Sequence, residues 1–279
     1  MNKQLIVTAD DFGLTEGVNR AIVRAHQTGV VTSASLMVNS PAFESAVELA
    51  RQNPRLDIGL HLDLTNKPFA LAVRPHKLNL EREVRAQIEK ALGTGLHITH
   101  LDGHKHVHVI PAVLRVIRAV APEYGIRAIR TMNAKATSMM SLLRRNPKAR
   151  AAIIQQYIFT RGARLAWKFC LPNAMAGPDS FYGIAETGFL DHEVFANIIR
   201  ELAFGAHEVM CHPGYLDDDL RQTPTRLLAH RERELEMLTS QEVRNLIRDS
   251  GIELISYRNL VEMYGIHRPD SLLNRCSAL

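Results

Sequence analysis

The chain has few cysteines and no long apolar run, and these absences exclude several classes of protein. Only three cysteines occur in 279 residues, Cys170, Cys211 and Cys276, and their wide spacing argues against a disulfide framework or a zinc knuckle. No run of about 18 apolar residues is present, so no membrane-spanning helix is predicted. The first seven residues lead straight into a strand-like segment without the apolar stretch of a signal peptide. A cytoplasmic location is therefore expected.

Nucleotide-binding loops and acidic residues in the middle of the chain are also missing. No Gly-x-Gly-x-x-Gly or Walker loop occurs, which disfavours nucleotide binding, and no nucleic-acid-binding motif is present. Residues 124–178 contain no Asp or Glu but ten basic residues, so this stretch carries +10 and the rest of the chain −5. The basic residues are Arg127, Arg130, Lys135, Arg144, Arg145, Lys148, Arg150, Arg161, Arg164 and Lys168. Such a stretch suits either an anionic membrane surface or an ordinary solvated helix face.

Strands and helices alternate along most of the chain. Short apolar strands are predicted at 5–9, 30–38, 57–64, 98–102, 126–131, 207–211 and 252–256. Helices are predicted at 16–27, 42–52, 80–92, 111–121, 192–204, 226–238 and 241–249. Repeated units of this kind predict parallel strands covered by helices. Because polar residues follow several separate strands, we expect one domain over 1–279, an α/β fold of the (β/α) barrel type, distorted or incomplete and TIM-like.

Residues 132–180 interrupt this alternation. Helical patches are predicted at 138–145 and 149–169, without the short strands that accompany helices elsewhere. We therefore interpret 132–180 as a basic insertion or cap on the barrel.

Two adjacent carboxylates, Asp10 and Asp11, follow the first apolar strand. Such a pair is costly unless something neutralises it, and a divalent metal ion would do so. One carboxylate could ligate the ion while the other stays free as a base. A simple turn or helix cap remains the alternative.

Histidines follow two further strands. Strand alternation places Gly59, His61 and Asp63 on one face of their strand. His100, Asp102 and His104 share one face of the next strand, within a stretch that holds four histidines in nine residues. Dense clusters of His and Asp are typical of metal sites, in which carboxylates orient the ligating imidazoles. The pattern does not decide which histidine binds, and a structural histidine or a polar loop remains possible for each.

His212 ends a late apolar strand and precedes Pro213 and Gly214. This is the strand-end position at which barrels place catalytic groups, although a turn histidine bonded to the backbone is the alternative. Cys211 next to it is not expected to be a nucleophile, because neighbours in a strand point to opposite faces.

Together these motifs resemble the YdjC-like carbohydrate deacetylase family. The resemblance covers Ile6–Leu14, Gly29–Ser35, Gly59–His61, Thr99–His104 and Met210–Gly214. It extends from residue 3 to about 264 but not over 132–180. Within the family, the chain length and the basic middle segment are most similar to the hopanoid-biosynthesis-associated member.

The resemblance implies a barrel of the glycoside hydrolase/deacetylase type with one bound divalent ion. It places the metal ligands at Asp11, His61 and His104, the catalytic base at Asp10 and a candidate acid at His212. The family implies magnesium, whereas two imidazoles and a carboxylate also suit zinc, cobalt or manganese. Gly103 stands where the family commonly has serine.

Three further residues are assigned supporting roles. Asp102 and His100 are expected to orient the ligands from behind. Arg130 is expected to bind the substrate.

The expected reaction is removal of an acetyl group from an N-acetylated amino sugar, with an N-acetylglucosaminyl hopanoid lipid as one candidate. The basic segment, with its aromatic side chains Tyr157, Phe159, Trp167 and Phe169, would then touch the inner face of the membrane. The oligomeric state stays open. The rival hypotheses are a metal phosphoesterase, which would use His100, His106 and His108 for more ions, and a non-catalytic sugar- or lipid-binding protein.

Overall fold

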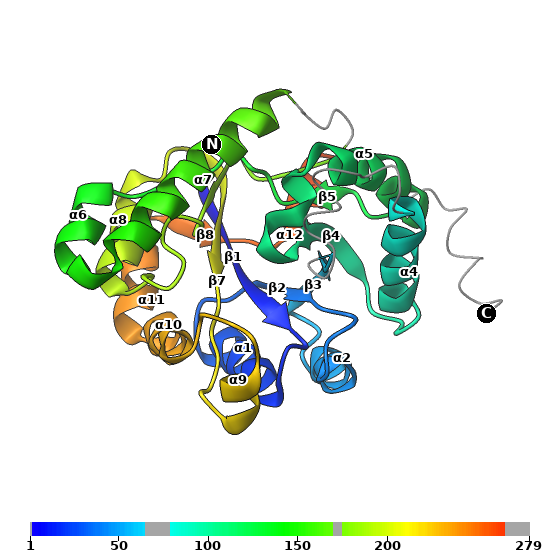
Figure 1. Ribbon diagram of the computed structural model, residues 1–279, viewed down its shortest axis with the longest axis horizontal. Helices are drawn as coiled ribbons and strands as arrows, with labels where there is room; N and C mark the ends of the chain where they lie inside the picture. The colour runs from blue at the N-terminus through cyan, green and yellow to red at the C-terminus, as the bar shows by residue number, and fades with distance from the viewer. Residues whose placement is uncertain (1, 65–78, 170–174, 266–279) are drawn as a thin grey trace.

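A parallel sheet of eight strands forms the centre of the computed structural model, which describes residues 2–64, 79–169 and 175–265 (Figure 1). The strands are β1 (Lys3–Phe12), β2 (Ser33–Leu36), β3 (Asp57–Leu62), β4 (Ile98–Gly103), β5 (Ala128–Ile129), β6 (Ser180–Tyr182), β7 (Gly205–Cys211) and β8 (Ile252–Leu254). Seven of them follow the order β5-β4-β3-β2-β1-β7-β6, and β8 pairs with β1. The predicted strands are all present, whereas β6 was not predicted.

Helices cover the outside of the strands, apart from the last one, which fills one end of the interior (Figure 1). They are α1 (Glu16–Thr28), α2 (Phe43–Gln52), α4 (Leu80–Leu92), α5 (Pro111–Val120), α6 (Met139–Arg145), α7 (Arg150–Phe169), α8 (His192–Glu201), α9 (Asp218–Gln222), α10 (Ala229–Thr239), α11 (Gln241–Asp249) and α12 (Tyr257–Met263). Short 3-10 turns are η2 (His104–Val109), η3 (Ala121–Tyr124) and η4 (Pro147–Ala149). Every predicted helix is confirmed; α9 and α12 are too short for the apolar period to reveal them.

The sheet curls until the irregular chain after β5 reaches β6 at the opposite edge. On one side of β1, β8 pairs with Lys3–Leu5 and β2 with Thr8–Phe12, while β7 pairs along the other side. The chain after β5 reaches β6 through two backbone hydrogen bonds, Lys135 N to Phe181 O (2.8 Å) and Phe181 N to Asn133 O (3.3 Å). The strands therefore form the distorted, incomplete barrel that the sequence predicted.

The apolar core is divided by the sheet into an outer and an inner part. Leu5, Val7 and Ala9 belong to the large cluster that includes the helices, whereas Ile6 belongs to a small inner cluster with Tyr257 and Leu260 of α12. Alternation along β1 explains the division. Since α12 fills one end of the interior with apolar side chains, polar groups can line the other end.

Within the segment 132–180, the described residues form α6 and α7 between β5 and β6. Ile153 and Trp167 of α7 are buried, so the helix is packed against the barrel. Trp167 was expected to touch a membrane. Its ring is instead packed inside the fold and is not available for such a contact. Among the described residues, no helix is long and apolar enough to cross a membrane.

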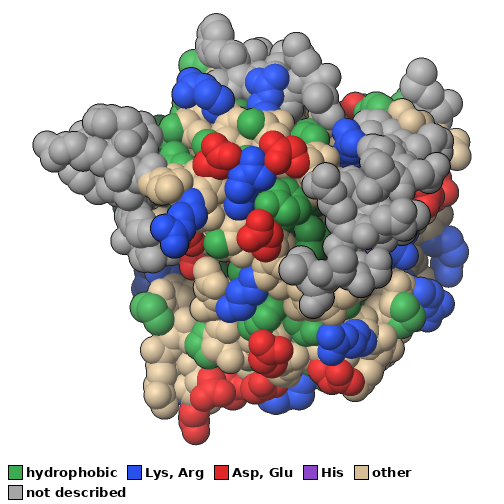
Figure 2. Space-filling view, turned by 90° about the vertical axis from the view of Figure 1, so that its right-hand side faces the viewer, with side chains coloured by type: hydrophobic (Ala, Val, Ile, Leu, Met, Phe, Trp, Pro, Cys, Tyr) green, Lys and Arg blue, Asp and Glu red, His purple; other side chains and the backbone are tan. Residues whose placement is uncertain are grey.

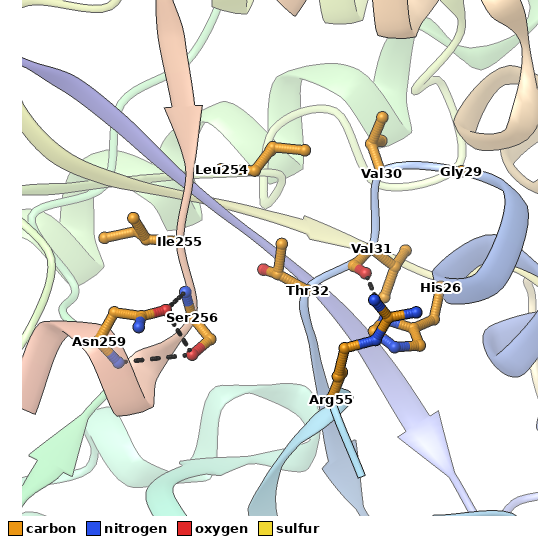
Figure 3. A pocket seen from close by; sticks show the side chains of 10 residues that line it. All are labelled: His26, Gly29, Val30, Val31, Thr32, Arg55, Leu254, Ile255, Ser256 and Asn259. Atoms are coloured by element: carbon orange, nitrogen blue, oxygen red, sulfur yellow. Dashed lines mark hydrogen bonds between the residues drawn. The ribbon is translucent and has the colours of Figure 1, made fainter. Parts of the chain in front are cut away.

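A pocket of about 190 Å³ lies in the barrel wall where β8 ends and β2 begins (Figure 3). Its lining comes from the segments that precede β2 and β3 and from residues 254–259 at the end of β8 and the start of α12, away from the strand ends that carry the aspartates and histidines. Its polar groups mostly bind one another: His26 Nδ1 lies 2.8 Å from Val31 O, and Ser256 N donates to Asn259 Oδ1. The pocket therefore provides no second candidate site.

Candidate active site

A bulge at the end of β1 brings two adjacent carboxylates to the same side. Neighbouring strand residues normally point to opposite faces. Here Asp11 has a left-handed backbone (φ 68°), and the pairing with β2 shifts register between Ala9 and Phe12. Bulges of this kind re-aim side chains next to active sites, and Asp tolerates the left-handed region better than most residues. Both Asp10 and Asp11 are 2% exposed, so the pair is buried in the barrel mouth.

Asp11, His61 and His104 meet at this point from β1, β3 and the end of β4. Asp11 Oδ1 lies 3.1 Å from His104 Nδ1 and 3.6 Å from His61 Nε2. Their candidate ligand atoms all lie within 4.8 Å of one another. Donor atoms on one tetrahedral zinc-type ion would be about 3.4 Å apart, given ligand distances of about 2.1 Å. The three residues therefore fit a single divalent ion.

His61 is oriented from behind by Asp102. The Asp102 Oδ1 atom lies 2.7 Å from His61 Nδ1, which leaves Nε2 directed at Asp11. Ligating histidines characteristically have a carboxylate partner of this kind. Burial lowers the pKa of His61, but the carboxylates of Asp102, Asp10 and Asp11 raise it to about 9 overall. An incoming ion must therefore displace a proton from this ring.

A second possible ligand group consists of Asp10, His61 and Asp102. It shares His61 with the first group, so within the described ranges the two groups are alternatives for one ion. Arg130 already binds both Asp10 and Asp102, and its charge would repel a cation placed between them. The Asp11 group is the better candidate.

Arg130 was expected to bind the substrate, and its position does not support that role. Its side chain is fully buried and donates to both oxygens of Asp10 at 2.7 and 2.8 Å. It also contacts Asp102 Oδ2 at 2.6 Å and Glu208 Oε1 at 3.0 Å. Since three carboxylates surround the guanidinium, none of its faces is left for a sugar. Arg130 instead fixes the orientation of Asp10.

His100 lies deeper in the barrel than His61 and supports its interior. Its ring stacks on Tyr257 with centroids 3.8 Å apart, and the Tyr257 hydroxyl donates to Glu208 at 2.6 Å. Burial lowers the pKa of His100 to about 3, so it is neutral. Gly59 makes room for this ring, because a Cβ there would lie 2.3 Å from His100 Nε2. Among the described residues, His100 makes no hydrogen bond to Asp11, His61 or His104, so its expected role in orienting a ligand is not supported.

The strand ends at Gly103, so the predicted strand parity does not extend to His104. His104 begins η2, and the next two residues, Lys105 and His106, have left-handed backbones (φ 49° and 58°). A Cβ at Gly103 would lie 2.8 Å from Val107 Cγ2. The turn at Gly103 therefore leaves little room for a larger residue.

His106 and His108 do not join the ligand group. The His106 ring lies 5.9 Å from the rings of both Phe159 and Phe181. His108 is fully buried, and burial lowers its pKa to about 3. In the described part of the chain, the extra histidines thus supply no additional metal site.

His212 lies at the mouth beside the carboxylates and is 9% exposed. Burial lowers its pKa to about 4, although Asp11 and Asp10 act in the opposite direction. Its neighbour Cys211 is fully buried with a pKa raised well above the usual value by burial, which excludes a nucleophilic thiolate there. Cys170 and Cys276 lie outside the described residues.

Two residues of α10, Arg231 and Glu234, complete the site and were not predicted. Arg231 Nη2 donates to Asp11 Oδ2 at 2.5 Å, and Glu234 Oε2 accepts the His212 backbone N–H at 2.6 Å. Both side chains are 1% exposed. The sequence did contain a signal for these two residues. Arg231 and Glu234 lie on the same helix face as Leu235 and Leu238, and a face with apolar residues at this spacing is expected to point towards the core.

The curled barrel and the Asp–His–His group at its mouth place the protein among α/β barrels whose strand ends carry a group that could hold a metal ion. More specifically, residues 4–249 match the model of the YdjC-like protein family, and the chain belongs to that family. The carbohydrate deacetylase of Brevibacillus brevis is 32% identical over 92% of this chain and 99% of its own length. That of Geobacillus stearothermophilus is also 32% identical, over 94% and 100%.

Solved structures agree on the fold. An Enterococcus faecalis V583 protein described as a candidate cellobiose-phosphate cleavage protein is 28% identical, with a TM-score of 0.69 over 93% of this chain and 99% of its own. The Xyl-CE4 domain of a termite-hindgut xylanase has a TM-score of 0.50 at 11% identity, over 96% and 93%. At that identity the likeness concerns the fold alone.

Proposed function

We propose that this protein is a metal-dependent deacetylase that removes the acetyl group from an N-acetylated amino sugar. The observation that carries the proposal is the convergence of Asp11, His61 and His104, with the spare carboxylate of Asp10 beside them. The curated relatives named carbohydrate deacetylase, which this chain matches over almost its whole length, supply the reaction class.

The reaction needs a strong nucleophile, because an amide is a poor electrophile. A divalent ion on Asp11, His61 and His104 would supply Lewis acidity, polarising the carbonyl and lowering the pKa of water. Asp10 Oδ2 lies 3.9 Å from His61 Nε2, so its carboxylate borders the ligand group. Asp10 accepts the proton of the attacking water. Its bidentate pair with Arg130 holds it in place for this transfer.

The departing amine needs a proton, and His212 supplies it. With its pKa lowered to about 4, the ring is neutral at pH 7. His212 therefore relays to the amine nitrogen the proton that Asp10 accepted from water, which returns Asp10 to its ionised form and gives acetic acid and the free amine. The Glu234 carboxylate fixes the backbone of His212 and so its place at the mouth.

The donor set bears on the choice of ion. Resemblance to the family implies magnesium, but magnesium prefers oxygen ligands and two of these three donors are imidazoles. Zinc, cobalt or manganese fits the set better. A phosphoesterase with two or three ions is less well supported, because both possible groups in the described residues use His61.

Acetate release from N-acetylated chitooligosaccharides tests the proposal. We expect activity that a chelator abolishes and one divalent ion per chain restores. Asp10→Asn should keep the ion, measured by elemental analysis, but lower kcat by about 10²–10⁴-fold because a proton acceptor is lost. Asp249→Asn, at an exposed carboxylate of α11, is the control. Full activity in Asp10→Asn, or activity that survives the chelator, contradicts the assigned roles.

We further propose that the substrate is a membrane glycolipid, with N-acetylglucosaminyl hopanoid as the candidate. The support is the surface of α6 and α7, two helices without an acidic residue. Their exposed apolar side chains are Met139, Met140, Ile154, Ile158, Phe159 and Leu165. By contrast, acidic and basic side chains are intermixed on the face of α4 and α5 (Figure 2). Basic, partly apolar helices suit anionic lipid headgroups.

A further inference from the structure

The two carboxylate oxygens of Asp11 face different partners. Oδ1 lies within 3.6 Å of a ring nitrogen of both His61 and His104. Oδ2 accepts a hydrogen bond of 2.5 Å from Arg231 Nη2.

The surroundings of Arg231 hold its side chain in position for the contact with Asp11. Its Nε donates to Leu227 O at 3.1 Å, while its Nη1 is buried and has no hydrogen-bond partner in the described residues. The side chain crosses Gly214, where a Cβ would lie 2.9 Å from Arg231 Cδ. Asp11 is thus the carboxylate to which this guanidinium donates.

A carboxylate can ligate an ion through one oxygen or through both. The guanidinium at Oδ2 occupies that oxygen, and its positive charge repels a cation that approaches it. Catalytic metal sites require positions that the protein leaves open. We propose that Arg231 restricts Asp11 to ligation through Oδ1 alone and so keeps a coordination position free for the reacting groups. This inference rests on the proposed metal-dependent function.

Replacing Arg231 with methionine separates this role from general support of the site. Arg231→Met removes a positive charge near the ion and frees Oδ2, so Co²⁺ affinity should not fall. The coordination number should rise, and kcat should fall by about 10–100-fold, the usual cost of losing a group that orients a ligand. If Arg231 only supported the structure of the site, its replacement would instead weaken Co²⁺ binding.

The electronic absorption of the Co²⁺-loaded protein gives the readout, because its visible bands weaken as the coordination number rises. We expect weaker bands for Arg231→Met and partial recovery for Arg231→Lys, which keeps the charge. Arg85→Met, at a partly exposed arginine paired with Glu81 and Glu123, is the matched control. If Arg231→Met does not fold, Arg231→Gln and Arg231→Lys provide the same comparison.

Unchanged bands in the Arg231 variants, or a large loss of Co²⁺ affinity, would overturn the inference. Both measurements are made without substrate. A wild-type protein that releases no acetate, while its Arg231 variants show weaker bands, would contradict the proposed function and leave the role of Arg231 supported.

Discussion

Arg130 is the residue on which the charge balance inside the barrel depends. Its single guanidinium contacts the carboxylates of Asp10, Asp102 and Glu208, each at most 2% exposed. Burial opposes its charge, but these carboxylates hold the pKa of Arg130 well above its usual value. Charges taken out of water in this way are tolerated only while they remain paired.

Removal of this cation is predicted to destabilise the fold as well as the site. Arg130→Met leaves three buried carboxylates without their shared partner, which should lower the free energy of unfolding by about 3–5 kcal/mol. Urea denaturation measures the loss. Arg85→Met, at an exposed ion pair, should cost at most about 1 kcal/mol. Equal costs for the two variants would mean that the buried network is not needed for stability.

At the scale of elements, the contact between β3 and α12 contains a carboxyl in an unfavourable position. Asp57 at the start of β3 is 1% exposed, and its Oδ2 accepts from Arg258 N (2.8 Å) and Thr99 Oγ1 (3.0 Å). Within the described residues its Oδ1 accepts no hydrogen bond, although Arg258 Nη2 lies 3.5 Å away. Burial raises the pKa of Asp57 to about 6. The ionised form thus destabilises the protein at neutral pH.

Asp57→Asn is predicted to relieve this cost. The folded pKa exceeds the unfolded value of 3.8, so the cost is complete above pH 6 and disappears as the pH falls towards 4. About two pKa units correspond to roughly 3 kcal/mol, an upper limit for the gain at pH 7. Thermal unfolding of both proteins between pH 4 and pH 8 measures the difference. A difference that does not change with pH would exclude ionisation as its cause, and Asp249→Asn is the exposed control.

At the scale of the whole molecule, charge is segregated along the chain. The segment 124–178 carries the positive excess, and its helices α6 and α7 lie together on one side of the barrel (Figure 1). Arg161 and Arg164 of α7 are exposed next to Ile158 and Leu165. This neighbourhood of cations and apolar side chains is the basis of the proposed membrane contact.

Sedimentation with lipid vesicles checks that contact. The protein is predicted to bind phosphatidylglycerol-containing vesicles at low salt and phosphatidylcholine vesicles much more weakly. Changing Arg161 and Arg164 to Gln should reduce the affinity about 30-fold, since each basic residue contributes about 1 kcal/mol at an anionic surface. Phe204→Ser, at an apolar side chain 70% exposed before β7, is the control. Binding that is insensitive to the α7 change and to lipid charge would remove the membrane from the proposal.

Sequence periodicity predicted most of the architecture, because long apolar strands and helices repeat with clear periods. It missed β6, which has three residues, and the closure between Lys135 and Phe181, which depends on irregular backbone. At the site, strand-end positions identified Asp10, Asp11, His61 and His212. The partners of these residues were harder to find: Arg130 was predicted as a substrate contact, and Arg231 was overlooked. Pairing across 120 or 220 residues leaves no local pattern.

Because of the bulge at Asp11, the number of residues between Ala9 and Phe12 is critical for the site. Deleting one of the two residues between Ala9 and Phe12 would remove the bulge and restore regular alternation with β2. Ala9 and Phe12 would still point to the outer core, but only one carboxylate would remain at the barrel mouth. Such a chain would keep its barrel strands yet lack either the proposed metal ligand or the proposed base, so the number of residues at this turn matters as much as the identity of its acids.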